Sequence, residues 1–350
     1  MQPIQSELPE PVESDPSAAP LEAILDGHDE IVWALEVASR KLFSASADRT
    51  IRVWDTASLR CVRVLEEHSR PVLSLAVSGK YLFSGSYDCT ICAWDLTSLR
   101  CVRKLNGHLD GIRAMVVAQG RLFSGSYDNT IRAWDLETLA CVGTMEGHTG
   151  PVRTLACVHG RLFSGSYDRT VRAWDMTSLA CLGSMEGHTG AVRALATGAR
   201  FVFSGSDDTT VRAWSVDTLQ LVKTLEGHTD NVRVLCSDSR RLFSGSWDKT
   251  IRVWSFDNLE CIKTLSGHSE AVLALAVTKS HLVSGSYDFT VRFWSLDTLR
   301  CVRNCEGHMD AVRVLSAAGP THDRVFSGSY DGTVGAWSGP PPPNAPPPAS

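Results

Sequence analysis

Apolar and polar residues alternate in short runs along most of the chain, and these runs come in sets of four. In residues 147–186, runs over 152–158, 161–166, 171–176 and 181–186 predict four β-strands, because successive side chains of a strand point to opposite faces. The segments between them, GHTG, YDRT and TSLA, are typical of turns. Each set therefore predicts one four-stranded antiparallel sheet.

The set recurs eight times with a period of forty residues, and each copy carries one histidine and one tryptophan in register. The two residues are 26 positions apart in the first seven copies and 29 apart in the last. They are His28, His68, His108, His148, His188, His228, His268 and His308, with Trp54, Trp94, Trp134, Trp174, Trp214, Trp254, Trp294 and Trp337. A period near forty with four short strands per unit is typical of a β-propeller, in which each unit forms one blade of a ring. Blades are numbered here in the order of these histidines.

The two ends of the repeat complete each other. Residues 21–26 (LEAILD) look like a fourth strand without a preceding three, while the last unit ends after its third strand at Trp337. Pairing these ends leaves no open sheet edge at the seam of the ring. We therefore expect an all-β, eight-bladed propeller whose N-terminal strand closes the last blade. The alternative is a seven-bladed ring with one unit displaced.

Composition separates the repeat from two tails. Residues 1–20 hold five prolines, four acidic side chains and no lysine or arginine, and residues 339–350 read GPPPPNAPPPAS. Such segments cannot bury a core, so we expect a disordered acidic tail, a single propeller domain over 21–338, and an extended polyproline tail. A proline-rich tail that docks a partner is a further alternative.

Charge and hydropathy restrict the classes of partner. The formal net charge of -5 disfavours overall attraction to nucleic acid or to an anionic membrane, although a local basic patch stays possible. No run approaches the eighteen or so apolar residues of a membrane span, and the N-terminus lacks a secretion signal. We expect a soluble protein, cytoplasmic and possibly nuclear.

Eleven cysteines are present, and six of them recur at one repeat position. Equivalent positions on different blades are too far apart for disulfides, so these residues are predicted to be small buried apolar side chains in a reducing compartment. They are Cys61, Cys101, Cys141, Cys181, Cys261 and Cys301. Cys89 and Cys92 form a lone CxxC on a strand, which does not predict a metal site. No metal and no cofactor are expected.

The repeated motifs GH, SGSYD and a tryptophan followed by aspartate resemble the WD40 repeat, and the resemblance covers most of the chain. The departures leave every repeated histidine and tryptophan in place. They are Glu67 before His68, Ala45 in the second strand of the first unit, and Ser215, Ser255, Ser295 and Ser338 after the tryptophan.

The resemblance implies that a hydrogen-bonded histidine, serine, aspartate and tryptophan brace each blade. The matching aspartates are Asp48, Asp88, Asp128, Asp168, Asp208, Asp248, Asp288 and Asp331. The matching serines are Ser44, Ser84, Ser124, Ser164, Ser204, Ser244, Ser284 and Ser327, an assignment left open because Ser46 and its equivalents share the same strand face.

Histidine, serine and aspartate are also the residue types of a hydrolase triad, so an enzyme is an alternative. A nucleophile site is built once, in a shaped pocket with an oxyanion hole, whereas these residues occur in eight equivalent copies. The repetition favours a structural brace, and no catalytic residue is expected.

Two repeat positions are predicted to point toward the central channel on the rim that carries the GH turns. The first position follows the opening Ile or Val of each unit, and its residues are Trp33, Leu73, Arg113, Arg153, Arg193, Arg233, Leu273 and Arg313. The second precedes the turn aspartate, and its residues are Ala47, Tyr87, Tyr127, Tyr167, Asp207, Trp247, Tyr287 and Tyr330.

This ring is uneven, with arginines in blades three to six and apolar residues in blades seven, one and two. Aromatic residues and arginine dominate binding hot spots, so we hypothesise a site for a short peptide. An anionic group, a phosphate or a carboxylate, would lie over blades three to six and an apolar residue over blades seven, one and two. The alternative is that duplication copied the arginines without function, or that Asp110, Asp230 and Asp310 neutralise them.

The pattern resembles the eight-bladed propellers of F-box ubiquitin-ligase receptors, in which arginines at these positions hold a phosphorylated degron beside a tryptophan and a tyrosine. By this resemblance Arg113, Arg153, Arg193, Arg233, Trp33 and Tyr87 are candidates. The units also resemble propellers of atypical kinases and of TNF-receptor-associated-factor ligases. The chain shows no F-box, so a target-recognition scaffold is expected, with a ligase substrate receptor as the alternative.

A second arginine row lies two residues before the tryptophans. It comprises Arg52, Arg132, Arg172, Arg212, Arg252 and Arg292, and Cys92 and Gly335 interrupt it. Alternation places this row on the face of the tryptophans, between blades, where packing is favoured over binding. RNA binding would need a continuous basic track with stacking platforms, and the channel mouth provides only a short one.

Overall fold

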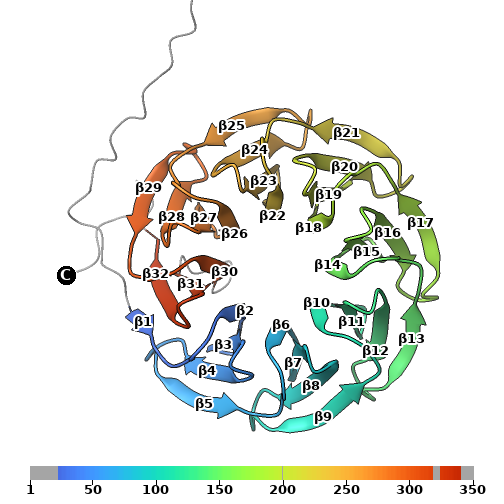
Figure 1. Ribbon diagram of the computed structural model, residues 1–350, viewed down its shortest axis with the longest axis vertical. Coiled ribbons are helices and arrows are strands. Elements are labelled where there is room, and N and C mark those ends of the chain that lie inside the picture. Colours follow the sequence, from blue (N-terminus) through green and yellow to red (C-terminus); the bar gives the residue numbers. More distant parts are fainter. Residues whose placement is uncertain (1–22, 199, 318–323, 340–350) are drawn as a thin grey trace, which may run out of the picture.

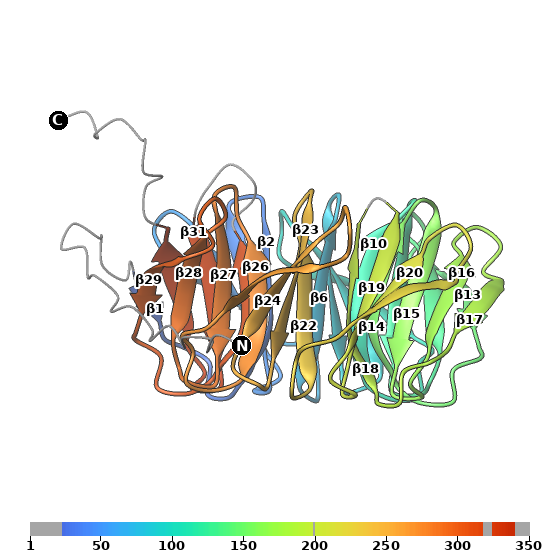
Figure 2. The same ribbon diagram turned by 90° about the horizontal axis from the view of Figure 1, so that it is seen from above.

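The computed structural model describes residues 23–198, 200–317 and 324–339. In them eight four-stranded antiparallel sheets stand around a central axis, as Figure 1 shows down that axis and Figure 2 from the side of the flat disc. The eight-bladed all-β prediction is confirmed, and the seven-bladed alternative is wrong.

The first, innermost strands are β2 (Val32–Ala38), β6 (Val72–Ser78), β10 (Ile112–Ala118), β14 (Val152–Val158), β18 (Val192–Thr197), β22 (Val232–Ser237), β26 (Val272–Val277) and β30 (Val312–Ala317). The second strands are β3 (Lys41–Ser46), β7 (Tyr81–Ser86), β11 (Arg121–Ser126), β15 (Arg161–Ser166), β19 (Phe201–Ser206), β23 (Arg241–Ser246), β27 (His281–Ser286) and β31 (Arg324–Ser329).

The third strands are β4 (Ile51–Asp55), β8 (Thr90–Asp95), β12 (Ile131–Asp135), β16 (Val171–Asp175), β20 (Val211–Ser215), β24 (Ile251–Ser255), β28 (Val291–Ser295) and β32 (Val334–Ser338). The outermost strands are β5 (Cys61–Leu65), β9 (Cys101–Asn106), β13 (Cys141–Met145), β17 (Cys181–Met185), β21 (Leu221–Leu225), β25 (Cys261–Leu265), β29 (Cys301–Cys305) and β1 (Ala23–Leu25).

The N-terminal strand closes the ring, as predicted. β1 pairs antiparallel with β32, with Ala23 opposite Ala336 and Leu25 opposite Val334, so the last blade takes its outer strand from the start of the chain. Residues 21 and 22 of the expected strand lie outside the described residues, as do the acidic segment 1–20 and positions 340–350 of the polyproline tail.

Strand limits follow turn chemistry. β16 ends at Asp175, one residue before the expected end, because its carboxylate accepts hydrogen bonds from the backbone N–H of Thr177 and of Ser178 and so starts the turn. These hydrogen bonds lower the pKa of the Asp175 carboxyl, and burial opposes that shift only slightly.

The apolar core lies between blades. One cluster joins Phe123 and Ile131 of blade three to Val152 and Trp174 of blade four, and similar clusters occupy the other interfaces. The approach is close enough that a β-carbon on Gly125 would stand 2.6 Å from a methyl of Val152. A glycine at this second-strand position therefore lets neighbouring blades pack tightly.

The repeated cysteines differ from the prediction. Cys61, Cys141 and Cys181 are exposed and Cys101, Cys261 and Cys301 are half-buried, so their expected burial is wrong. Each begins the outermost strand of its blade, which has no neighbouring strand on its outer side (Figure 1). All eleven cysteines are free thiols.

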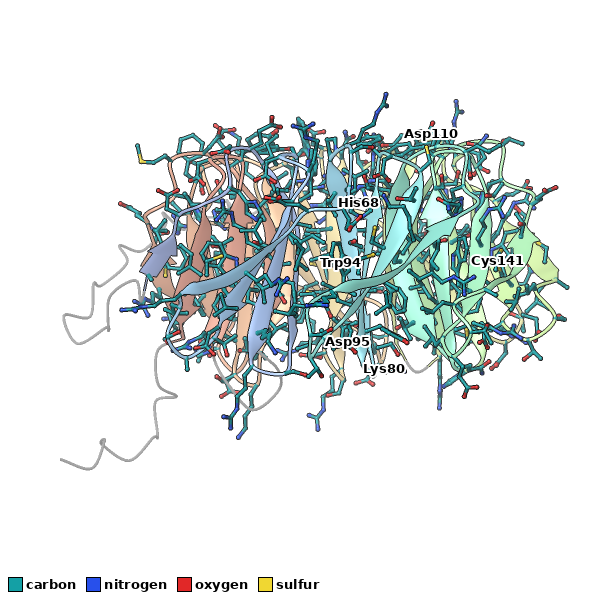
Figure 3. All side chains as sticks on the ribbon, turned by 90° about the horizontal axis from the view of Figure 1, so that it is seen from below. His68, Lys80, Trp94, Asp95, Asp110 and Cys141 are labelled. Carbon is teal, nitrogen blue, oxygen red and sulfur yellow. The ribbon has the colours of Figure 1, made fainter. Side chains whose placement is uncertain are left out.

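Figure 3 distinguishes the two rims. Asp110 lies on one rim and Lys80 and Asp95 on the other, with His68 and Trp94 between them. The rim of Asp110 carries the GH turns and the turns between second and third strands, and it is called the top rim below. Within the described part of the chain, no helix is long and apolar enough to cross a membrane.

Candidate functional site

Each blade contains a buried hydrogen-bonded network just below the top rim. In blade four, His148 Nδ1 lies 2.6 Å from the Asp168 carboxylate and Nε2 lies 2.7 Å from Ser164 Oγ. The Trp174 indole N–H donates to the same Ser164 oxygen at 2.8 Å. A histidine protonated on Nδ1 satisfies all of these contacts, because Nδ1 donates a hydrogen bond to the carboxylate while Nε2 accepts one from the serine hydroxyl.

The network repeats in all eight blades, with histidine–aspartate distances of 2.6 to 3.2 Å. The serine is the earlier of the two in each second strand, Ser164 in blade four. The later one, Ser166, instead donates to the Gly150 carbonyl in the GH turn. The two serines thus tie different loops to the strand.

The turn aspartates are stabilised as carboxylates. Burial by itself raises the pKa of Asp168, but hydrogen bonds from His148 and Thr170 outweigh it and hold the pKa well below its ordinary value. The same balance applies to the other seven turn aspartates. The network therefore depends on ionised aspartate.

These networks have the residue types of a triad without an accessible nucleophile. Ser164 is fully buried, and its hydroxyl is already engaged by His148 and Trp174. A substrate carbonyl has no route to that oxygen. The geometry suits a brace that fixes the top loops.

The first-position residues of all eight blades line one cavity of about 350 Å³ along the central channel. Leu73 and Leu273 are buried in its wall, and Trp33 lies beneath Arg313, whose guanidinium carbon is 5.4 Å from the indole centre. Arg113 approaches the same indole at 6.0 Å. Trp33 therefore interacts with cations from blades eight and three.

The second-position aromatic residues lie at the top rim, where many touch one another. Tyr87 stacks on Tyr127 with ring centres 5.5 Å apart. Trp247, Tyr287 and Tyr330 form a second series, at 6.1 Å and 5.9 Å between successive rings. Trp247 remains 45% exposed, so aromatic surface is available to a ligand.

Arg193 is already neutralised within the chain. Its Nε donates to Asp207 at 2.8 Å, its Nη2 forms an ion pair with the same carboxylate at 2.5 Å, and its Nη1 donates to the Tyr167 hydroxyl at 2.7 Å. The hydrogen bond with Asp207 raises the pKa of Arg193. Asp207 is the single acid among the sixteen predicted channel positions, and this exception in the sequence could have identified it as a partner for an arginine.

Four other channel arginines lack such a partner. Within the described residues, no carboxylate forms an ion pair with Arg113, Arg153, Arg233 or Arg313, and the carboxylates of Asp110, Asp230 and Asp310 instead accept hydrogen bonds from the next backbone N–H. These acids therefore do not neutralise the ring in this structure.

The four arginines without a carboxylate partner face the same cavity, in which Arg313 is buried and the other three are half-buried. Arg313 is 7% exposed and its Nε has no hydrogen-bond partner among the described residues. Burial, with repulsion from Arg233 and Arg153, lowers the pKa of Arg313 to about 9, and burial with repulsion from Arg233 lowers that of Arg153 to about 10. Burial lowers the pKa of Arg113 and Arg233 as well. The free cations thus span blades three, four, six and eight rather than three to six.

The second arginine row packs between blades. A β-carbon on Gly107 would meet Arg132 Nη1 at 2.9 Å and Trp134 at 3.3 Å, so this guanidinium lies between the GH turn and the indole. Arg132 Nη1 also contacts the sulfur of Cys141 at 3.8 Å. These arginines point away from the channel cavity.

The chain was compared with known proteins. A family model described as "WD domain, G-beta repeat" matches residues 20–55, 59–95, 99–135, 139–175, 179–215, 219–255, 259–295 and 299–338. A crystal structure of the computationally designed Ika8 protein aligns with a TM-score of 0.85 and 32% identity, over 91% of this chain and 100% of the designed one.

Two curated proteins match over single repeats. The WD repeat-containing protein pop2 of Schizosaccharomyces pombe is 43% identical over 44 residues, 13% of this chain and 6% of that protein. The zinc finger CCCH domain-containing protein 17 of Oryza sativa subsp. japonica is 51% identical over 41 residues, 12% of this chain and 9% of that protein. The matched segments span less than a tenth of either relative. Because the eight family matches cover most of the sequence, the chain belongs to the WD40 repeat family.

Proposed function

We propose that this WD40 propeller is a non-catalytic interaction scaffold whose top face binds a short peptide carrying a carboxylate or phosphate group. WD40 propellers generally serve protein interaction, and the channel positions of the top rim change from blade to blade. The observation that carries the proposal is the group of four channel arginines that have no carboxylate partner among the described residues.

Electrostatic attraction to the channel arginines would hold the anionic group of the peptide. These guanidiniums have lost hydration that the chain replaces only in part, through a hydrogen bond from Arg113 to the Leu73 carbonyl and the contacts of Arg113 and Arg313 with the Trp33 indole. Each of the four is also repelled by at least one neighbouring arginine. An incoming anion replaces the lost hydration and relieves the repulsion. The exposed aromatic rings beside the cavity supply apolar contact area for the rest of the peptide.

The test is a selection from a displayed library of random linear peptides, followed by affinity measurement on synthetic peptides. We expect acidic or phosphomimetic sequences, and we expect R153A/R233A to weaken them by about tenfold or more for each arginine lost. Arg193 is a poor choice for this variant, because Asp207 already occupies it. Enrichment of uncharged peptides that bind the variant equally well would contradict the proposal.

A narrower alternative is a substrate receptor of a ubiquitin ligase. It requires this chain to bring a bound target to a ligase subunit. Affinity capture from cell extract separates the two ideas: ligase subunits should accompany wild-type protein and R153A/R233A alike, while targets should be lost from the variant and from phosphatase-treated extract. Capture of targets without any ligase subunit leaves the scaffold proposal alone standing.

A further inference from the structure

We infer that the peptide crosses the channel axis in extended form, entering over blade one and leaving over blade five. This inference rests on the proposed function and specifies the path of the ligand. It follows from the two places where the aromatic rim is interrupted.

The second rim position is aromatic in six blades, and the exceptions are Ala47 in blade one and Asp207 in blade five. In a ring of eight, these blades stand on opposite sides of the axis, as β2 and β18 do in Figure 1. The rim therefore has two gaps joined by a straight line through the channel.

Aromatic side chains wall both sides of this line. Tyr87 and Tyr127 stack face to face on the side of blades two to four. Trp247, Tyr287 and Tyr330 make successive ring contacts on the side of blades six to eight. A peptide that left the channel on either side would meet these rings, whereas a path over Ala47 and Asp207 meets no aromatic side chain at the second rim position.

The gap at blade five holds no unpaired side chain at the second rim position. Asp207 is paired with Arg193, and the adjacent loop residue is Gly190, at which an added β-carbon would stand 2.6 Å from the backbone nitrogen of Asp208. The loop therefore adds no side chain to the rim there. The carboxylate of Asp207 is held by Arg193, so it repels an acidic ligand less than a free acid would.

The floor along the path carries cations at both ends. At the blade-one end, Arg313 and Arg113 lie against the Trp33 indole. Arg153 and Arg233 lie on either side of blade five, and both face the cavity without a carboxylate partner among the described residues. An extended peptide fits this floor with an acidic group between Arg153 and Arg233.

The experiment uses the full chain and a peptide selected from the random library, synthesised with a benzophenone photo-crosslinker at either end. Mass spectrometry should locate one end on residues of blade one and the other on residues of blade five. Cross-links of both ends to blades two to four, or to blades six to eight, would overturn the path while leaving peptide binding intact. A library that yields no binder contradicts the proposed function itself.

Filling the gaps gives an independent measurement. A47W and D207W should each bind the peptide about tenfold or more weakly than the serine variant of the same position, because an indole blocks one end of the path. A47S and D207S keep the gaps open and are the matched controls. A47S should stay within about threefold of wild type, whereas D207S also frees Arg193 and should bind the acidic peptide at least as tightly as wild type. Melting curves verify that each variant folds, and if A47W does not fold, the cross-link positions decide alone. Unchanged affinity in both folded tryptophan variants would sink the inference.

Discussion

The networks within the blades and the wall of the channel use similar polar residues in opposite ways. In each blade the histidine, serine, aspartate and tryptophan satisfy one another at 2.6 to 3.2 Å, and the arrangement is the same eight times. In the channel wall four buried or half-buried arginines have no carboxylate partner among the described residues, and the composition changes from blade to blade.

The difference separates stability from binding. A polar group whose hydrogen bonds are complete has little left to offer a ligand, and it becomes costly only when a partner is removed. A buried charge without a partner costs stability in the free protein and gains most from a ligand of opposite charge. The repeated residues therefore explain the ring, and the variable ones carry the recognition that we propose.

The largest expected effect is loss of the ring in acid. The folded-state pKa of each of the eight turn aspartates lies below the ordinary value of 3.8, so the unfolded chain takes up protons first as the pH falls. The stability from these carboxylates is complete above about pH 4 to 5 and is lost progressively below it. Urea unfolding from pH 7 to pH 3 measures this. A midpoint that does not move over that range would contradict ionised aspartates in the networks.

Breaking one network should have the next largest effect. S164A removes the acceptor of the Trp174 indole N–H and the partner of His148, leaving two buried groups unpaired at roughly 1–3 kcal/mol each. Chemical denaturation measures the loss. S178A in the same blade is the control, because its exposed hydroxyl donates to Asp175 and accepts only a long hydrogen bond of 3.4 Å from the Ala180 N–H, so its loss should cost less than about 1 kcal/mol. Equal losses in the two variants would contradict the special role of the buried serine.

Removing the one paired channel arginine should cost less. R193A leaves Asp207 without its cation, but both side chains are about a quarter exposed, so solvent screening limits the loss to about 1 kcal/mol. The double variant R193A/D207A should recover part of that loss, because it removes both charges. A double variant less stable than R193A would show that Asp207 does not contribute to stability mainly through its ion pair with Arg193.

The smallest effect should have the opposite sign. R313L replaces a buried, unpaired guanidinium by the leucine that blades two and seven already carry at this position, as Leu73 and Leu273. Stability should rise by on the order of 1 kcal/mol, since the loss of a buried charge and of its repulsion from Arg233 outweighs the loss of its cation–π contact with Trp33. A lower melting temperature would mean that the Trp33 contact outweighs burial and repulsion.

The propeller could be predicted from the sequence because the patterns that indicate it are local and repeated. Strand periodicity, turn residues and the unmatched fourth strand at residues 21–26 each predict the fold without knowledge of distant contacts. The cysteines were misplaced because alternation alone does not say which strand is the exposed edge of a blade. The sequence did not predict the Arg193–Asp207 pair, because the two residues lie at the ends of different strands. Whether their side chains turn toward each other cannot be read from residue spacing.

The central claim is that unpaired channel arginines bind an anionic peptide group. Calorimetric titration of one selected acidic peptide tests it most directly, with R153A/R233A compared against R49A/R169A, which removes the same charge from exposed turns of the same rim. We expect the affinity for the peptide to fall about a hundredfold in the channel variant and to change little in the turn variant. Equal losses in the two variants, or none in either, would contradict it.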